Sequence, residues 1–235
     1  MEKIDYAVVT GLKTWLNGKL SSVDGRVENN CFAIAEAIAR YGNTYGFLST
    51  QLWTKLLCGY MINLKNKQEI AKILPLNIAR DVENLFEIEL ENFCHENSAG
   101  KNQMHITNTH KRRFQSDWMS GFIKEEAALA FIISSYKEIN IFALKDGNII
   151  EGNKWRNSLT DSDIGITITK LNLNLIDAIV FSSREFCKAF ANNSMMRAWI
   201  EIFYNTTSPL KRQMIASKIG AMGNNNDLAV VWWIK

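Results

Sequence analysis

The sequence lacks most features of membrane and secreted proteins. Only 2 of its 235 residues are proline, so long proline-rich linkers are excluded. Its apolar runs, such as residues 127–133, are far shorter than the roughly 20 residues that a membrane-spanning helix needs. Residues 1–10 have no basic start and no long apolar stretch. We therefore expect no secretory signal, no membrane contact and a cytoplasmic location.

Charge, cysteine pairs and phosphate-binding motifs are also scarce. The 27 basic and 24 acidic residues leave a net charge of only +3, so binding to nucleic acid would need a local basic patch. The four cysteines form no CxxC pair and mostly lie in apolar stretches, which indicates buried thiols in a reducing compartment. Neither glycine-rich phosphate-binding motif occurs. We expect no ATP binding by this chain alone and no cofactor.

Apolar residues make up 47% of the chain and aromatic residues 11%, which is enough to build a substantial core. Apolar residues at helical spacing predict helices over residues 4–20, 30–41, 48–62 and 77–94. The chain is therefore predicted to be an α-rich α+β protein, with a helical N-terminal region over residues 1–95.

A polar and then basic segment, residues 96–114, is predicted to be a linker or loop. Residues 115–235 are predicted to form a mixed α/β region. In that region we expect a helix over 122–135, a hairpin turning at Asp146–Gly147, an alternating strand near 164–168, a helix over 174–192, a helix from Pro209 and a closing strand over 228–234. A helix followed by a hairpin is compatible with a winged helix.

Cys31 is the one candidate nucleophile, because a position at a predicted helix start would lower its pKa. A cysteine hydrolase also needs a histidine base, and the only histidines are His95, His105 and His110. These three lie in or just before the polar segment, and none is followed by an acidic partner in a strand. The pattern favours a buried structural thiol, with a cysteine hydrolase using Cys31 as the alternative.

Metal and carboxylate motifs are incomplete. Cys94 and the three histidines match no standard zinc spacing. Asp146, Glu151 and Lys154 lack the Glu-x-Lys spacing of a metal-dependent nuclease. We therefore predict no metal site, no catalytic residue and no enzyme activity.

Two basic groups are candidates for contact with DNA phosphates. Lys111, Arg112 and Arg113 precede aromatic residues, and Lys211, Arg212 and Lys218 share the helix predicted after Pro209. Trp232 and Trp233 are candidate partner-binding residues, since tryptophan is enriched at interface hot spots. A solvated basic surface and two core tryptophans are the plain alternatives.

Four segments, in order, resemble the middle components of bacterial ABC-three-component defence systems, which include Lamassu-type, SMC-associated anti-phage systems. They are residues 28–37 (ENNCFAIAEA), the apolar helix and closing Leu-Pro over 52–75, IKEEAALAF with INIFALKDGNIIE over 122–151, and REFCKAFANNSMMRAWIEIF over 184–203.

The resemblance implies a non-enzymatic adaptor subunit. Such a component would link an SMC-like ATPase to an effector nuclease in a DNA-sensing complex, which would contact double-stranded DNA. A stand-alone DNA-binding regulator remains a further alternative. It should bind a specific DNA alone with a steep salt dependence, whereas an adaptor should need its partners.

Overall fold

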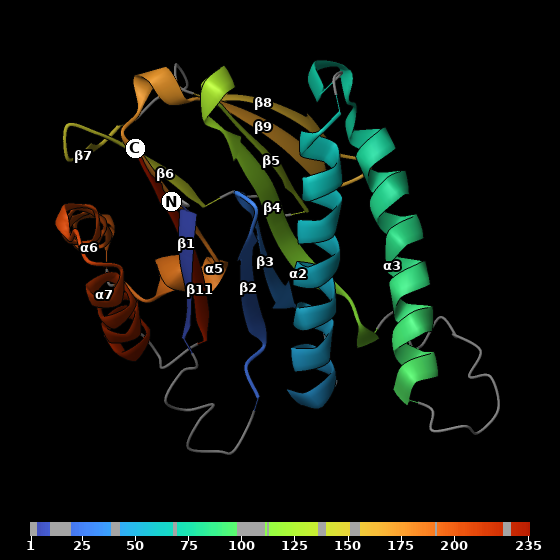
Figure 1. Cartoon of the computed structure of the whole chain (residues 1–235). Coiled ribbons are helices and arrows are strands. Elements are labelled where there is room, and N and C mark those ends of the chain that lie inside the picture. The colour runs from blue at the N-terminus through green and yellow to red at the C-terminus, as the bar shows by residue number, and fades with distance from the viewer. Residues whose placement is uncertain are drawn as a thin grey trace.

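The computed structural model describes residues 4–9, 20–38, 43–67, 70–97, 111, 113–135, 140–150, 156–190, 192–222 and 227–235. In this part of the chain, two antiparallel β-sheets stack face to face and helices cover both outer faces (Figure 1). The predicted helical N-terminal half with a winged-helix-like C-terminal half is therefore wrong.

One sheet has the strand order β1-β11-β10-β6-β7, and we call it sheet A. Its strands are β1 (Ile4–Val9), β6 (Ile141–Lys145), β7 (Asn148–Ile149), β10 (Ala178–Ser182) and β11 (Leu228–Ile234). The other, sheet B, has the order β2-β3-β4-β5-β9-β8. It contains β2 (Val23–Glu28), β3 (Cys31–Ala37), β4 (Ser116–Lys124), β5 (Leu129–Ser134), β8 (Arg156–Asp161) and β9 (Ile166–Asn172).

Two long helices, α2 (Asn43–Lys65) and α3 (Pro75–Asn97), cover the outer face of sheet B. Three shorter helices, α5 (Arg184–Lys188), α6 (Asn193–Asn205) and α7 (Pro209–Met222), cover the outer face of sheet A. Single turns of 3-10 helix lie at η1 (Ile70–Lys72), η2 (Glu125–Ala127) and η3 (Leu173–Leu175). The order of layers is helix, sheet, sheet, helix (Figure 1).

The predicted helix over residues 30–41 is wrong, because these residues include strand β3. Cys31, Ala33 and Ala35 pack toward α2 and α3, while Phe32 and Ile34 pack toward sheet A. A strand buried on both faces is a continuous apolar run, and such a run also satisfies helical spacing. Asn29 and Asn30 adopt φ of 52° and 57°, which makes them the turn between β2 and β3.

Other predicted helices also contain strands. Residues 122–135 contain the end of β4 and all of β5, separated by η2. The segment 174–192 contains β10 followed by the short α5, and the first predicted helix contains β1.

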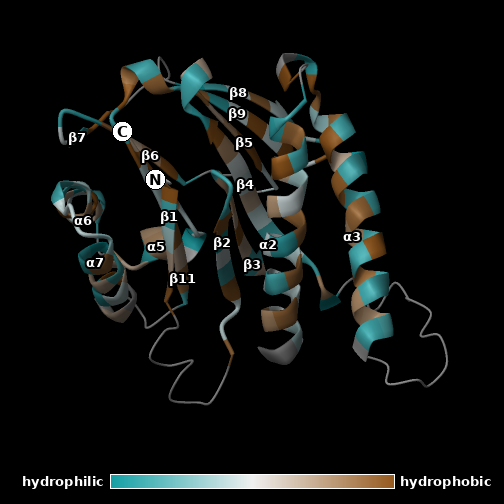
Figure 2. Cartoon of the chain, viewed as in Figure 1, coloured by the Kyte–Doolittle hydropathy of each residue, from teal (hydrophilic) through white to brown (hydrophobic). Residues whose placement is uncertain are grey.

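Several elements are confirmed. The helices predicted over 48–62 and 77–94 lie within α2 and α3, and Figure 2 shows α3 with alternating apolar and polar residues. The hairpin turn has φ of 51° at Asp146 and 79° at Gly147. Helix α7 begins at Pro209, and the backbone N–H of Arg212 donates to the Ser208 carbonyl at 3.0 Å.

The interface between the sheets is the central core. Phe32 of β3 stacks on Phe181 of β10 with ring centroids 4.2 Å apart. The first and last strands pair antiparallel, with Ile4 opposite Trp233. Trp118, Phe122 and Phe131 lie in the layer beneath α2 and α3.

The predicted loop over residues 96–114 falls mostly outside the described residues. Strand β4 follows this segment in sequence and pairs with β3 along the whole length of β3. Among the described helices, none has the combination of length and apolar content needed to span a bilayer.

Candidate functional site

Four charged residues gather at one end of the sandwich, and we call them the end cluster. Glu36 lies near the end of β3, and Asp117 lies opposite it on β4. Arg184 begins α5 just after β10, and Asp227 immediately precedes β11. The end cluster therefore combines side chains from sheet B with side chains attached to two strands of sheet A.

The guanidinium of Arg184 bridges the two carboxylates of sheet B. Its Nη2 donates to Oδ2 of Asp117, and its Nε lies 3.6 Å from Oε2 of Glu36. The backbone N–H of Arg184 donates to Oε1 of the same glutamate. Three contacts from a single arginine thus join the two sheets at this end.

The burial of Glu36 explains why it needs such a partner. Its side chain is 9% exposed, whereas that of Arg184 is 47% exposed. A carboxylate removed from water is strongly destabilising unless hydrogen bonds and an opposite charge compensate. The side chain of Arg184 supplies the charge, and its backbone supplies one hydrogen bond.

Asp227 connects strand β11 to the segment before β2 at the same end of the sandwich. Its Oδ2 accepts a hydrogen bond from the Ser22 backbone N–H at 2.9 Å. The carbonyl of Ser22 in turn accepts from the N–H of Ala37, also at 2.9 Å. This chain of bonds joins the residue before β11 to the end of β3, beside Glu36.

Ser183 fixes the backbone from which Arg184 extends. Its N–H donates to the Ala229 carbonyl at 2.9 Å, and its Oγ accepts from the Ala229 N–H at 3.1 Å. The amide of Asn140 donates to the carbonyl of Ser183 at 3.3 Å. The base of Arg184 is therefore held on both sides by sheet A.

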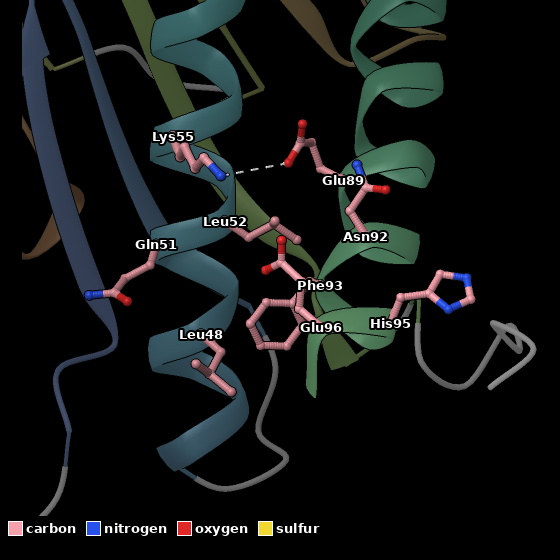
Figure 3. Close-up of a pocket in the computed structure, with 9 residues that line it drawn as sticks. All are labelled: Leu48, Gln51, Leu52, Lys55, Glu89, Asn92, Phe93, His95 and Glu96. Atoms are coloured by element: carbon pink, nitrogen blue, oxygen red, sulfur yellow. Dashed lines mark ion pairs between the residues drawn. The ribbon is translucent and has the colours of Figure 1, made fainter. Parts of the chain in front are cut away.

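A separate hollow of about 460 Å³ lies between α2 and α3. Its lining comprises Leu48, Gln51, Leu52, Lys55, Glu89, Asn92, Phe93, His95 and Glu96. Lys55 and Glu89 face one another across the two helices at 4.0 Å, and His95 points away from them (Figure 3). The lining mixes apolar side chains with one ion pair and offers no nucleophile beside a base.

Cys31, the candidate nucleophile, is fully buried. Burial raises the pKa of its thiol to about 11, with Lys65 acting in the opposite direction and Glu28 adding to the rise. Its Sγ lies 3.7 Å from the carbonyl of Asn29. The expected lowering of the pKa fails because Cys31 begins a strand, not a helix.

The described residues of the two predicted basic groups lie on opposite sides of the molecule. Lys111 pairs with Glu87 of α3, and Arg113 lies over the ring of Tyr45 with 5.1 Å between its Cζ and the centroid. Arg112 lies outside the described residues, as do His105, His110, Glu151 and Lys154.

The second group lies on α7, over the other sheet (Figure 1). Lys211 and Lys218 are exposed there, and Nε of Arg212 donates to the carbonyl of Phe203 at 3.3 Å. The contact of either group with DNA stays a prediction.

Trp232 and Trp233 are buried, with exposed fractions of 1% and 2%. Trp232 packs edge-on against Phe203 of α6 at 4.8 Å between centroids. Nε1 of Trp233 donates to Oε1 of Glu125 at 3.0 Å. In this structure both rings lie inside the core, and their contact with a partner stays a prediction.

Sequence reasoning missed the end cluster. Glu36 is the only charged residue in the run CFAIAEA, and this isolated carboxylate was the available signal. Its partners Asp117 and Arg184 are distant in sequence, and only the strand register brings them together.

Solved structures identify the fold. This chain is similar to a bacterial serine phosphatase, with a TM-score of 0.62 at 9% identity over 100% of this chain and 98% of that one. It is also similar to the PPM Ser-Thr phosphatase MsPP from Mycobacterium smegmatis in complex with cacodylate (0.59, 8%, 98% and 97%). A third is the catalytic domain of the serine threonine protein phosphatase PstP in complex with two manganese ions (0.55, 10%, 98% and 98%). No family model and no curated protein matches the sequence.

The chain therefore has the PP2C-type phosphatase fold. This finding overturns the predicted winged-helix, DNA-binding adaptor of a defence complex, and also the cysteine hydrolase. It likewise contradicts the prediction that the chain is no enzyme, because the three similar structures described above are phosphatases.

The described residues do not fit a centre like the manganese pair of PstP. Among them, no three Asp, Glu, His or Cys side chains come close enough together to hold a metal ion. At the end cluster, the carboxylates of Glu36 and Asp117 already bind the guanidinium of Arg184. That guanidinium occupies one oxygen of each carboxylate, and the backbone N–H of Arg184 occupies the second oxygen of Glu36.

Proposed function

We propose that this chain acts on phosphorylated serine and threonine residues of proteins, as a phosphatase. The observation that carries this proposal is the end-to-end match to phosphatases, which covers 98% or more of this chain in each comparison described above. A match of this extent includes both sheets and both helical layers. It differs from a likeness limited to a common substructure.

The end cluster is the proposed reaction site. Elsewhere the three layers of core are largely apolar, whereas Glu36, Asp117 and Asp227 bring three carboxylates to one end. Hydrolysis of a phosphate ester needs a positioned water and donors that stabilise charge on the phosphoryl oxygens. A carboxylate can take a proton from that water, and the part-exposed guanidinium of Arg184 can donate to a phosphoryl oxygen.

The test is release of inorganic phosphate from phosphoserine and phosphothreonine peptides, with a phosphotyrosine peptide for comparison. We expect release by the wild-type chain. Loss of a general base usually lowers a rate by about 100-fold or more. At least one of the variants Glu36→Gln and Asp117→Asn should therefore show a fall of this size. The measurement is the initial rate of phosphate release at matched protein concentration.

The matched control is Glu28→Gln. Glu28 forms an exposed ion pair with Arg26 on the same sheet, and its loss should change the rate by less than about twofold. If no phosphopeptide releases phosphate, with or without added Mn²⁺, the proposed activity is contradicted. If E28Q and E36Q lower the rate equally, the end cluster is not the reaction site.

The partners expected from sequence remain a separate proposal. An SMC-like ATPase, an effector nuclease and double-stranded DNA are supported only by the sequence resemblance described above. Copurification of the chain with the products of neighbouring genes tests this assembly. A cytoplasmic location is also proposed, supported by the four free cysteines of the chain.

A further inference from the structure

We propose that the guanidinium of Arg184 is the resident cation of the end cluster, holding Glu36 and Asp117 in place of a divalent metal ion. The consequence for catalysis rests on the proposed function, whereas the role of Arg184 as the bound cation does not. Three observations carry the inference: the contacts of Arg184, the burial of its partners and the strands from which they come.

The contacts match the way a cation is held by two carboxylates. The guanidinium reaches Oδ2 of Asp117 with one nitrogen and Oε2 of Glu36 with another. A planar guanidinium has several donors in a fixed fork and stays charged at all relevant pH. One arginine can therefore neutralise two carboxylates that face each other across neighbouring strands.

Burial makes this cation necessary. The side chain of Glu36 is 9% exposed and that of Asp117 is 21% exposed. They lie opposite one another in the β3–β4 register, so without a cation their negative charges would repel. A metal ion or a basic side chain can balance these charges, and here the basic side chain makes both contacts.

The position of Arg184 fixes it for this role. Its backbone N–H donates to Oε1 of Glu36, so main chain and side chain hold the same carboxylate. Ser183, the preceding residue, is bonded to Ala229 of β11 in both directions. The arginine is thus anchored in sheet A and binds carboxylates of sheet B.

The experiment measures Mn²⁺ uptake by the full chain from the loss of the electron paramagnetic resonance signal of free Mn²⁺. We expect the wild type and the variant Arg26→Gln to take up little ion. The variant Arg184→Gln keeps the length of the side chain but removes its charge, and should bind Mn²⁺ about tenfold more tightly than wild type. Arg26 is the matched control because it pairs with Glu28 on the exposed surface.

A triple variant identifies where the ion binds. Adding Glu36→Gln and Asp117→Asn to R184Q should abolish the gain. The proposal is overturned if folded R184Q gains no Mn²⁺ binding, or if wild type binds Mn²⁺ and loses it in the E36Q/D117N double variant. The second comparison keeps Arg184 intact, so it can overturn the proposal even if R184Q does not fold.

Mn²⁺ uptake does not depend on turnover. If the chain is inactive on phosphopeptides but its variants bind Mn²⁺ as expected, the proposed function is contradicted and Arg184 is still supported as the resident cation. If wild type releases phosphate and binds Mn²⁺ between Glu36 and Asp117, the role of Arg184 is contradicted and the proposed function is still supported.

Discussion

At the scale of the residue, burial decides the chemistry of the thiols. Cys31 and Cys58 lie between sheet B and helix α2, and burial raises their pKa values to about 11 and about 12. The negative charge of Glu28 adds to the rise in both pKa values. Neutral thiols in an apolar layer pack as small hydrophobic groups and are poor nucleophiles.

These raised pKa values predict a loss of stability at alkaline pH. In the unfolded chain a cysteine thiol is exposed to water and has a pKa near 9.0. As pH rises, the thiols therefore lose their protons at a lower pH in the unfolded chain than in the folded chain. The contribution is fully present below about pH 9 and is lost as pH rises toward about 11 or 12. The free energy of unfolding in urea should therefore start to fall near pH 9 and continue to fall toward about pH 11. In the variant Cys31→Ala/Cys58→Ala the fall should be smaller; an equal fall would contradict the assignment.

At the scale of the element, close approach of strands limits which residues fit. Gly121 of β4 faces Phe32 of β3 in the register. A Cβ atom at position 121 would lie 2.6 Å from the carbonyl oxygen of Phe131 and 2.9 Å from Cε1 of Phe32. Backbone on one side and a buried ring on the other leave no room for it.

Gly121→Ala should therefore lower the free energy of unfolding by about 1–3 kcal/mol, the usual result of overpacking a core. Gly59→Ala is the matched control, because a Cβ at position 59 of helix α2 meets nothing within 4 Å. That change should be neutral or stabilising by about 0.5–1 kcal/mol, since alanine favours a helix. Urea unfolding of both variants checks the contrast, and equal effects would show that strand spacing is not the cause.

The elements also show how far sequence alone can lead. Helices α2, α3 and α7 and the Asp146–Gly147 turn were predictable because amphipathic spacing, a proline start and an Asp-Gly turn act locally. Strands β3, β5 and β10 were not predictable, because each is covered on both faces and lacks the alternation of apolar and polar residues that marks a strand. Glu36 stood out only as a lone charge in an apolar run, and its pairing with Asp117 and Arg184 depends on register.

At the scale of the whole molecule, the last strand holds sheet A together. Strand β11 lies between β1 and β10, paired with both. Its Trp232 faces the layer of α6 and α7, and its Trp233 faces the interface between the sheets. One strand therefore contributes to two of the three apolar layers.

Removal of residues 228–235 should prevent folding, because it splits sheet A and removes both tryptophans from the core. The expected result is loss of the cooperative unfolding transition followed by far-ultraviolet circular dichroism. Removal of Lys235 alone takes away one backbone hydrogen bond to Asp177 and should leave the transition in place. A folded chain lacking the whole strand would show that β1 and β10 can pair without it.

The pairing of β1 with β11 brings Ile4 opposite Trp233, and the two ends of the described chain lie close together (Figure 1). The described backbone therefore begins and ends at nearly the same place in the fold. A circularly permuted chain, with the present ends joined and new ends placed in a surface turn such as Asp146–Gly147, should keep every pair of neighbouring strands.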